Sequence, residues 1–287
     1  MAATSPPVGF IGGSGIYEAL ELSNVREESV TTPYGDPSAP ITVGELAGRE
    51  VAFLPRHGRN HQYSPTEVPY RANMHALKQL GCERVLSSNA VGSLDESLPP
   101  RTLVVPDQTF DRTRSRPYTF FGDGVVVHQE FAEPYCPHLS EQLAGHADAT
   151  DADCVRGGTY VCIEGPQFST RAESEWYRAQ GWEVIGMTAV PEAKLAREAE
   201  LCYATVAGVT DWDVWKGEVD GRLSEVLENA AHNETAIKEL LEATIRGLPD
   251  ERACDCGSAL EGTVNTPADA IPEETRERVE LLLGDYL

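Results

Sequence analysis

The sequence has few basic residues. Its 287 residues include 23 Lys and Arg against 46 Asp and Glu, a formal net charge of −23. Nucleic-acid binding is disfavoured, because it depends on neutralising phosphates with Lys and Arg. A cationic partner is one alternative explanation, but the acids are spread along the chain rather than blocked. Since the Debye length falls to about 3 Å at 1 M salt, we interpret the charge as halophilic adaptation to a salt-rich cytoplasm.

Long hydrophobic runs are also lacking. No apolar stretch approaches the roughly 18 residues that a transmembrane helix needs. The first seven residues lack the basic region and apolar core of a secretory signal. Hydrophobic residues still make up 41% of the chain, enough for a sizeable core. The sequence therefore predicts a soluble, cytoplasmic protein with no membrane partner.

The seven cysteines form no Cys-x-x-Cys pair and have no zinc-like spacing, so no metal site is predicted. Cys254 and Cys256 are separated by one residue. Such a pair could chelate a metal poorly, form a strained disulfide or do nothing. Reduced and structural cysteines are the default in a cytoplasm.

Apolar runs alternate with helical patterns along the chain. The expected strands cover residues 8–11, 41–46, 50–54, 84–87, 103–105, 159–163, 183–185 and 201–209. The expected helices cover residues 70–80, 170–180, 190–199, 223–246 and 273–283. This alternation predicts one α/β domain over residues 1–287, with a mixed central β-sheet flanked by helices. The segment from Asp250 to Asp269 is expected to be a mobile loop.

A basic cluster stands out in this acidic chain. The eight residues from Leu54 to His61 include Arg56, His57 and Arg59. Arg offers a planar, charged fork suited to phosphate oxygens, and a neighbouring His can donate to them or titrate near neutral pH. The cluster indicates a phosphate site, with a solvated surface loop as the alternative.

Two further segments carry polar groups of interest. The loop from Gly12 to Gly15 matches neither a dinucleotide-binding motif nor a P-loop, but it offers backbone N–H groups and the Ser14 hydroxyl. A tight turn explains it equally well. Asp211 and Asp213 lie beside Trp212 and follow a nine-residue apolar run. Apolar walls or a like charge would raise a carboxyl pKa, so one Asp could deliver a proton near neutral pH; a solvated turn is the alternative.

The polar clusters share one property: each is expected directly after an apolar strand. Ligands in open α/β sheets bind outside the carboxyl ends of strands, so we expect the clusters to meet in one crevice. The clusters are Ser14, Arg56 with His57, Asn89 with Ala90, Glu164 to Pro166, Met187 with Thr188, and Thr210 to Asp213.

Over nearly the whole chain, these motifs resemble the methylthioadenosine phosphorylases of the purine nucleoside phosphorylase superfamily. The matching segments, in family order, are Ile11 to Gly15, Arg56 to His61, Asn89 to Leu94, Glu164 to Ser169, Gly186 to Thr188 and Thr210 to Asp213. The resemblance implies the fold of that superfamily. It also implies phosphorolysis of methylthioadenosine to adenine and methylthioribose 1-phosphate, with inorganic phosphate as co-substrate and no metal or organic cofactor.

The resemblance implies roles for individual residues. The phosphate-binding set is Ser14, Arg56, His57, Asn89, the Ala90 backbone and Thr188. The substrate-binding set is Met187 at the ribose, Phe168 and Ser169 beside the base, Trp212, and an apolar wall of Leu223, Val226 and Leu227. Asp211 would protonate or hydrogen-bond the five-ring nitrogen of the base, and Asp213 would accept from its exocyclic amino group. His128 matches a histidine lent to a neighbour's site, which implies a homotrimer or a hexamer of two trimers.

Some residues depart from the family pattern. Ser14 stands where many members have Thr, and Asn89 resembles phosphorylases of 6-oxopurine nucleosides. Asp213 argues for an aminopurine, because a carboxylate accepts from an amino group and repels a carbonyl. The alternatives are a 6-oxopurine or methylthioinosine phosphorylase, a nucleosidase that uses water, or a purine-binding regulatory protein without turnover. The Cys254 and Cys256 pair resembles a disulfide-forming element of some archaeal members.

Overall fold

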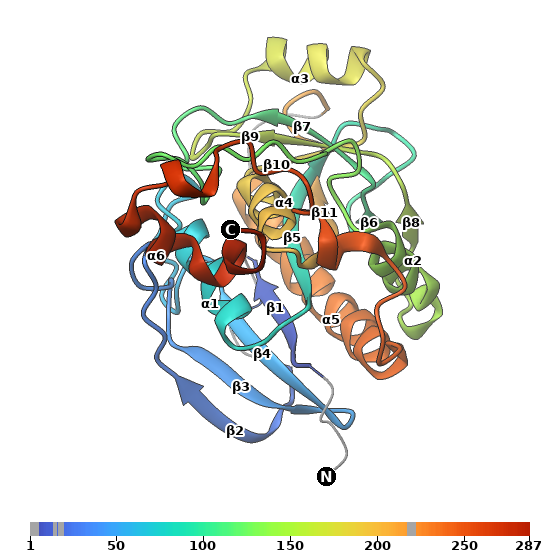
Figure 1. Cartoon of the computed structure of the whole chain (residues 1–287). Coiled ribbons are helices and arrows are strands. Elements are labelled where there is room, and N and C mark those ends of the chain that lie inside the picture. The colour runs from blue at the N-terminus through green and yellow to red at the C-terminus, as the bar shows by residue number, and fades with distance from the viewer. Residues whose placement is uncertain (1–5, 14–15, 17–19, 217–221) are drawn as a thin grey trace.

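A single mixed β-sheet of eleven strands runs through the described part of the chain, with helices on both faces (Figure 1). The structure is a computed structural model that describes residues 6–13, 16, 20–216 and 222–287. The strands are β1 Val8–Gly12, β2 Ser23–Glu28, β3 Ile41–Leu46, β4 Arg49–Pro55, β5 Arg84–Ser93, β6 Leu103–Val105, β7 Gln108–Arg112, β8 Cys154–Arg156, β9 Thr159–Ile163, β10 Val184–Gly186 and β11 Cys202–Asp211. The α-helices are α1 Tyr70–Gln79, α2 Pro137–Gly145, α3 Arg171–Ala179, α4 Ala189–Glu198, α5 Arg222–Gly247 and α6 Glu273–Leu283. Short 3₁₀ helices are η1 Ala147–Ala149, η2 Asp255–Ser258, η3 Ala268–Ala270 and η4 Gly284–Tyr286.

The sheet branches at β5. The main path runs β2-β3-β4-β1-β5-β10-β9-β7, and β11 pairs with β5 and β6 beside it. Strands β4, β1, β5 and β11 run parallel, so their carboxyl ends lie at the same edge. Strand β10 runs antiparallel to β5 and pairs only with its last two residues. The carboxyl-terminal part of β5 is therefore where the two sets of strands meet.

Successive residues of the central strands contribute to two separate hydrophobic cores, one on each face of the sheet. Phe10 belongs to one hydrophobic cluster with Leu240 of α5 and Leu139 of α2, whereas the next residue, Ile11, belongs to another with Met74 of α1 and Leu195 of α4. Neighbouring residues in a strand point to opposite faces, and a strand covered on both faces is apolar throughout. This explains why β1 and most of β11 read as unbroken apolar runs. Strand β2, at the edge of the sheet, is polar and exposed, as edge strands commonly are.

The predicted fold class is confirmed, and every predicted strand and helix is present within a few residues. One expectation is wrong. Asn89 and Ala90 lie inside β5, and Thr210 and Asp211 lie inside β11, rather than after these strands. The two strands are longer than predicted because they pair in parallel from Arg84 onward. Elements β2, β7, β8 and α2 were missed because their sequences lack a continuous apolar run.

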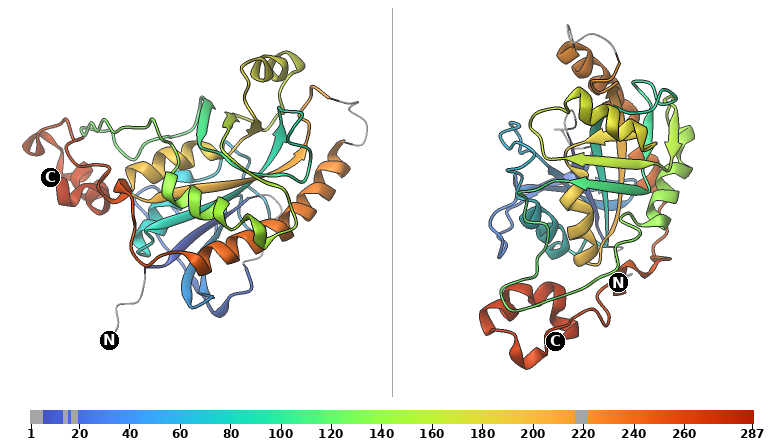
Figure 2. Two further views of the ribbon diagram at one scale, coloured as in Figure 1. Left: turned by 90° about the vertical axis from the view of Figure 1, so that its right-hand side faces the viewer. Right: turned by 90° about the horizontal axis from the view of Figure 1, so that it is seen from above.

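The C-terminal segment crosses to one end of the molecule and lies beside the chain that follows β7 (Figure 2). A β-bridge joins Val127 and Val264, and the Asn265 N–H donates to the Val126 carbonyl at 2.8 Å. Part of the segment that was expected to be a mobile loop therefore holds secondary structure and long-range contacts. Within the described residues, no helix has the length and apolar character needed to cross a membrane.

Candidate active site

A cavity of about 580 Å³ opens where the carboxyl-terminal parts of β5 and β11 meet the segments that follow β4, β9 and β10. It brings together most of the residues selected from the sequence. Those lining it are Arg56, His57, Ala90, Phe168, Met187, Thr188, Asp211 and Asp213. One wall comes from Val226 and Leu227 of α5. Its volume is typical of a small-molecule site.

Arg56 follows β4 and is 1% exposed, so its charge needs a partner inside the protein. The Glu192 carboxylate of α4 supplies it. Arg56 Nε donates to Glu192 Oε1 at 2.5 Å, and Nη2 donates to Oε2 at 3.0 Å. Ser87 Oγ and the Ser88 carbonyl accept two further bonds. Although burial alone would lower the pKa of Arg56, the Glu192 carboxylate raises it above the ordinary value. The guanidinium therefore stays charged and is held in one orientation.

His57 lies beside Arg56, but its ring is neutral. Burial, and then the Arg56 charge, lower the pKa of His57 to about 4. The ring nitrogen Nδ1 lies 2.8 Å from the Tyr63 carbonyl, which can only accept. The proton of the neutral ring is therefore on Nδ1, and Nε2 is an acceptor. The ring also stacks on His61, with centroids 4.5 Å apart.

Thr188 lines the same cavity, two residues after β10 and at the start of α4, the helix that carries Glu192. Its hydroxyl oxygen accepts from Asn89 Nδ2 at 2.6 Å. The Thr205 hydroxyl of β11 in turn donates to Asn89 Oδ1, which fixes the orientation of the amide. Because Thr188 Oγ1 accepts from Asn89, its hydroxyl can still act as a donor. Asn89 itself lines a neighbouring cavity of about 10 Å³, room for about one water.

Gly13 allows the chain after β1 to pack closely against Arg56 and Ser88. Its N–H donates to Ser88 Oγ at 3.1 Å. A Cβ at this position would lie 2.4 Å from the Ser88 carbonyl oxygen and 2.8 Å from Arg56 Nη1. A side chain here would displace the arginine. Ser14, the next residue, lies outside the described residues.

At the opposite end of the cavity, a β-bulge positions the two aspartates. Val209 pairs with Val91 and Asp211 with Gly92, so Thr210 is the extra residue. Bulges bend a strand and re-aim its side chains, and they occur often beside active sites. Asp211 Oδ1 accepts from the Asp213 N–H at 2.8 Å, and Asp213 has a positive φ of 52°. The Thr210 hydroxyl lies 2.8 Å from Asp211 Oδ2 and 3.1 Å from the Val91 carbonyl oxygen.

The remaining walls are apolar and partly open. Phe168 and Leu227 are 62% and 61% exposed, and Met187 packs closely against the chain after β9. A Cβ on Gly165 would lie 2.5 Å from Met187 Sδ, and φ there is 68°, so this approach needs glycine. The side chain of Leu223, part of the predicted wall, lies outside the described residues.

Three further predicted substrate residues do not line the cavity in the described part of the chain. Ser169 is buried, and its hydroxyl has no hydrogen-bond partner among the described residues. The Trp212 ring packs edge-on against Trp215, with the Lys216 ammonium 3.9 Å from its centroid. His128 is exposed, and its N–H donates to the Thr263 carbonyl at 3.0 Å. The roles predicted for these residues stay predictions.

Sequence reasoning missed Glu192, the partner of Arg56. It also missed Thr205, which holds Asn89. A signal for Glu192 existed, because the glutamate interrupts the apolar stretch from Ala189 to Ala193. A charge on a buried helix face usually has a buried partner. Thr205 gave no signal, because threonine is common in ordinary strands.

The chain belongs to the phosphorylase superfamily, whose family model matches residues 7–246. An S-methyl-5'-thioadenosine phosphorylase from Koribacter versatilis is 49% identical over 284 residues, 97% of this chain and 96% of that protein. The crystal structure of a methylthioadenosine phosphorylase from an antarctic soil metagenomic library superimposes with a TM-score of 0.90 and 45% identity, covering 98% and 99% of the two chains. A mutant adenosine/methylthioadenosine phosphorylase from Schistosoma mansoni, in complex with methylthioadenosine, gives a TM-score of 0.81 and 37% identity over 89% and 96%. Within the superfamily, the chain is therefore a member of the S-methyl-5'-thioadenosine phosphorylase family.

Proposed function

We propose that the protein cleaves methylthioadenosine with inorganic phosphate, releasing adenine and methylthioribose 1-phosphate, in the cavity described above. The carrying observation is that one cavity holds the buried Arg56, which bonds the Ser88 carbonyl of β5, and an aspartate pair whose Asp211 pairs with Gly92, four residues further along the same strand. The relatives and solved neighbours named above carry the same activity in their names. Phosphate carries a charge opposite to that of the arginine, and the amino group of adenine can donate a hydrogen bond to a carboxylate.

At the phosphate end, Arg56 supplies the fixed positive charge, and Thr188 and the Ala90 backbone face the same space. Neutral His57 adds an acceptor at Nε2, so it suits a phosphate that still carries a proton. Fixed donors that need no rearrangement during the reaction are the largest source of catalysis in sites of this kind. The phosphate is held for attack on the sugar carbon as the purine departs.

At the base end, Asp211 delivers a proton to the leaving purine. The neighbouring Thr210 hydroxyl is suited to both protonation states of this carboxyl. It donates to Asp211 Oδ2 when the group is charged. It donates to the Val91 carbonyl, and accepts from Asp211, when the group is protonated. A hydroxyl that can switch partners lowers the cost of moving the proton.

Asp213 sets the choice of base. A carboxylate accepts from the amino group of adenine and repels the carbonyl of a 6-oxopurine. The apolar wall of Val226 and Leu227 is suited to the methylthio group. The protein therefore binds aminopurine nucleosides in preference to inosine or guanosine.

His128 serves the site of a neighbouring subunit in a homotrimer or in a hexamer of two trimers. In support, its side chain is exposed and lies outside the cavity of its own chain. Light scattering after size-exclusion chromatography measures the assembly, and the His128→Ala variant should lower turnover without changing its size. Adaptation to high salt and a cytoplasmic location stay predictions from composition.

The activity is tested by chromatography of methylthioadenosine, adenosine and inosine incubated with the protein at high KCl, with and without phosphate. We expect phosphate-dependent release of adenine and little reaction with inosine. Adenine released equally without phosphate would replace phosphorolysis by hydrolysis. If no nucleoside reacts, the protein would instead be a purine-binding protein without turnover.

A further inference from the structure

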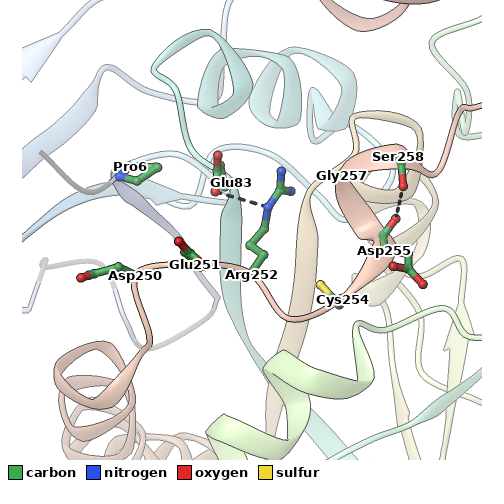
Figure 3. A pocket seen from close by; sticks show the side chains of 9 residues that line it. All are labelled: Pro6, Glu83, Asp250, Glu251, Arg252, Cys254, Asp255, Gly257 and Ser258. Carbon is green, nitrogen blue, oxygen red and sulfur yellow. Dashed lines mark hydrogen bonds and ion pairs between the residues drawn. The ribbon is translucent and has the colours of Figure 1, made fainter. Parts of the chain in front are cut away.

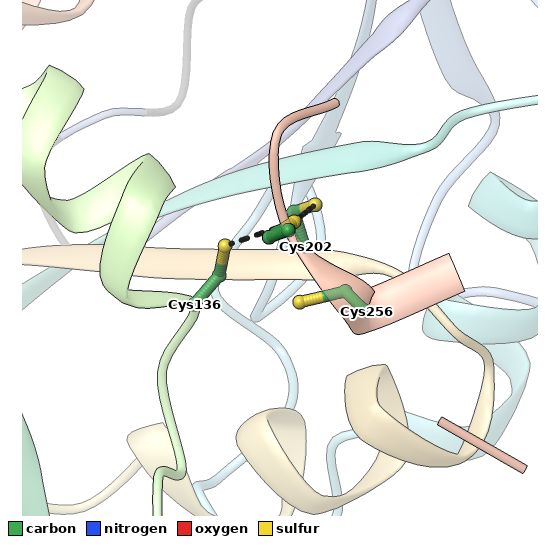
Figure 4. A group of neighbouring side chains, drawn as sticks. Cys136, Cys202 and Cys256 are labelled. Atoms are coloured by element: carbon green, nitrogen blue, oxygen red, sulfur yellow. Dashed lines mark hydrogen bonds between the residues drawn. The ribbon is translucent and has the colours of Figure 1, made fainter. Parts of the chain in front are cut away.

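Four cysteines from three distant parts of the sequence meet at one point away from the cavity. Cys136 precedes α2, Cys202 begins β11, and Cys254 and Cys256 flank the start of η2. Figure 4 shows Cys136, Cys202 and Cys256 close together, each from a different part of the chain. All four sulfur atoms lie within 4.8 Å of one another. The one-residue spacing of Cys254 and Cys256 gave no metal motif by itself, and the fold supplies the other two ligands.

The spacing of the sulfurs fits a tetrahedral ion. Cys254 Sγ lies 3.6 Å from Cys136 Sγ and 3.3 Å from Cys202 Sγ. Zinc binds thiolates at about 2.3 Å, so the sulfurs of a tetrahedral tetrathiolate site stand about 3.8 Å apart. Cys254 is close to two sulfurs at once, as a shared ion requires.

The surroundings are suited to thiolates. The Leu139 N–H, in the first turn of α2, donates to Cys136 Sγ at 3.4 Å. Arg197 of α4 places Nη1 3.8 Å from Cys256 Sγ. Four thiolates around a divalent ion carry a net charge of −2, and such outer contacts stabilise a bound ion. A hydrophobic cluster that includes Cys202 and Cys256 encloses this region on the inner side.

The cluster also has an entry path. Cys254 is half-buried and lines a surface hollow of about 510 Å³ together with Glu83, Arg252 and Asp255 (Figure 3). An ion could reach the cysteines from this side, where Arg252 is paired with Glu83 and Glu251 and Asp255 add negative charge.

We propose that these four cysteines form a structural zinc site. Binding exchanges four thiol protons for one Zn²⁺, and the protons leave to solvent. With four protein sulfurs, the ion keeps no open position for substrate or water, which is the arrangement of structural rather than catalytic sites. The site also lies far from the chemistry: Cys202 and Asp211 are the two ends of the ten-residue β11, about 30 Å apart at about 3.3 Å per residue.

The zinc site fastens the C-terminal segment to the body of the molecule. Cys254 and Cys256 belong to that segment, whereas Cys136 directly precedes α2 and Cys202 begins β11. The same segment contacts the chain around His128 through the Thr263 carbonyl. Loss of the ion should therefore release the C-terminal segment first. The geometry of the cavity should be unchanged, because the sheet determines it.

The proposal is tested on the full chain, produced with added zinc and purified with a reductant but no chelator. Elemental analysis should find one zinc per chain, and titration with a mercurial in the presence of a zinc indicator should release it. Cobalt substitution should give the charge-transfer and ligand-field bands of a tetrahedral tetrathiolate. Cys254→Ser should lose the metal, and Cys154→Ser, which changes a cysteine outside the cluster, should retain it.

Two results would overturn the proposal. One is wild-type protein, prepared in this way, that contains no stoichiometric metal. The other is a peptide map, made after alkylation without reduction, that finds a disulfide among the four cysteines. Because these measurements use the wild-type chain, they decide the question even if Cys254→Ser fails to fold. Neither depends on the catalytic activity.

Discussion

The two ends of the cavity are built in different ways. Arg56, at the phosphate end, is 1% exposed and bonded to β5 and α4, whereas Phe168 and Leu227, around the base and methylthio positions, are more than 60% exposed. The phosphate end is thus organised by folding itself, before any ligand binds. At the other end the aspartates rest on one bulge, and the walls are open. Changes at the first end should reduce stability together with activity, and changes at the second should reduce activity with the fold intact.

The largest effect on stability is expected for Glu192→Ala. This change leaves the Arg56 guanidinium buried without its carboxylate, and breaking a buried ion pair costs about 3–5 kcal/mol. Denaturant unfolding measures the loss. The double variant Arg56→Met with Glu192→Leu removes both charges and should recover much of the stability while remaining inactive. Equal losses for the single and double variants would contradict the argument.

The largest effect on activity is expected for Asp211→Asn. Without a proton donor, turnover should fall by about 10²–10⁴-fold, while the KM for phosphate and the melting temperature stay nearly constant. Steady-state kinetics and thermal unfolding test this split. Asp36→Asn makes the same charge change at an exposed site and should leave the kinetics unchanged. If Asp211→Asn retains full turnover, Asp211 is not the acid.

The acid sensitivity of the phosphate end should be traceable to His57. Its pKa is about 4 in the fold, against an ordinary 6.5. As pH falls below 6.5, His57 becomes protonated in the unfolded chain, whereas in the folded chain it stays neutral until about pH 4. Stability should therefore decrease by up to about 3 kcal/mol across that window. His57→Gln does not titrate, so its unfolding free energy should fall less between pH 7 and 4. If the unfolding free energies of the two proteins fall in parallel with pH, the His57 ring has an ordinary pKa and is exposed to water in the fold.

Local patterns were enough to predict the main strands and helices and the residues that gather around the cavity. They worked because parallel strands carry their end residues to a common edge, whatever the details of packing. The bulge at Thr210 and the ion pair of Arg56 with Glu192 escaped prediction. Each depends on contacts between residues far apart in the chain, and the sequence around each partner has no period or motif that reveals the other. The four-cysteine cluster escaped for the same reason.

The smallest effect, and the sharpest test of the base end, is expected for Asp213→Asn. The amide can donate to a 6-oxo group, so the preference for adenosine over inosine should shrink by about 10–100-fold, corresponding to the cost of one unpaired buried polar group. The ratio of kcat/KM for the two nucleosides measures this preference without reference to stability. Because Asp213 bonds Asp211 through its backbone N–H, the substitution keeps that contact and leaves the proton donor in place. An unchanged ratio would assign base selection to the open walls of the cavity instead, and Phe168 would then be the residue to vary.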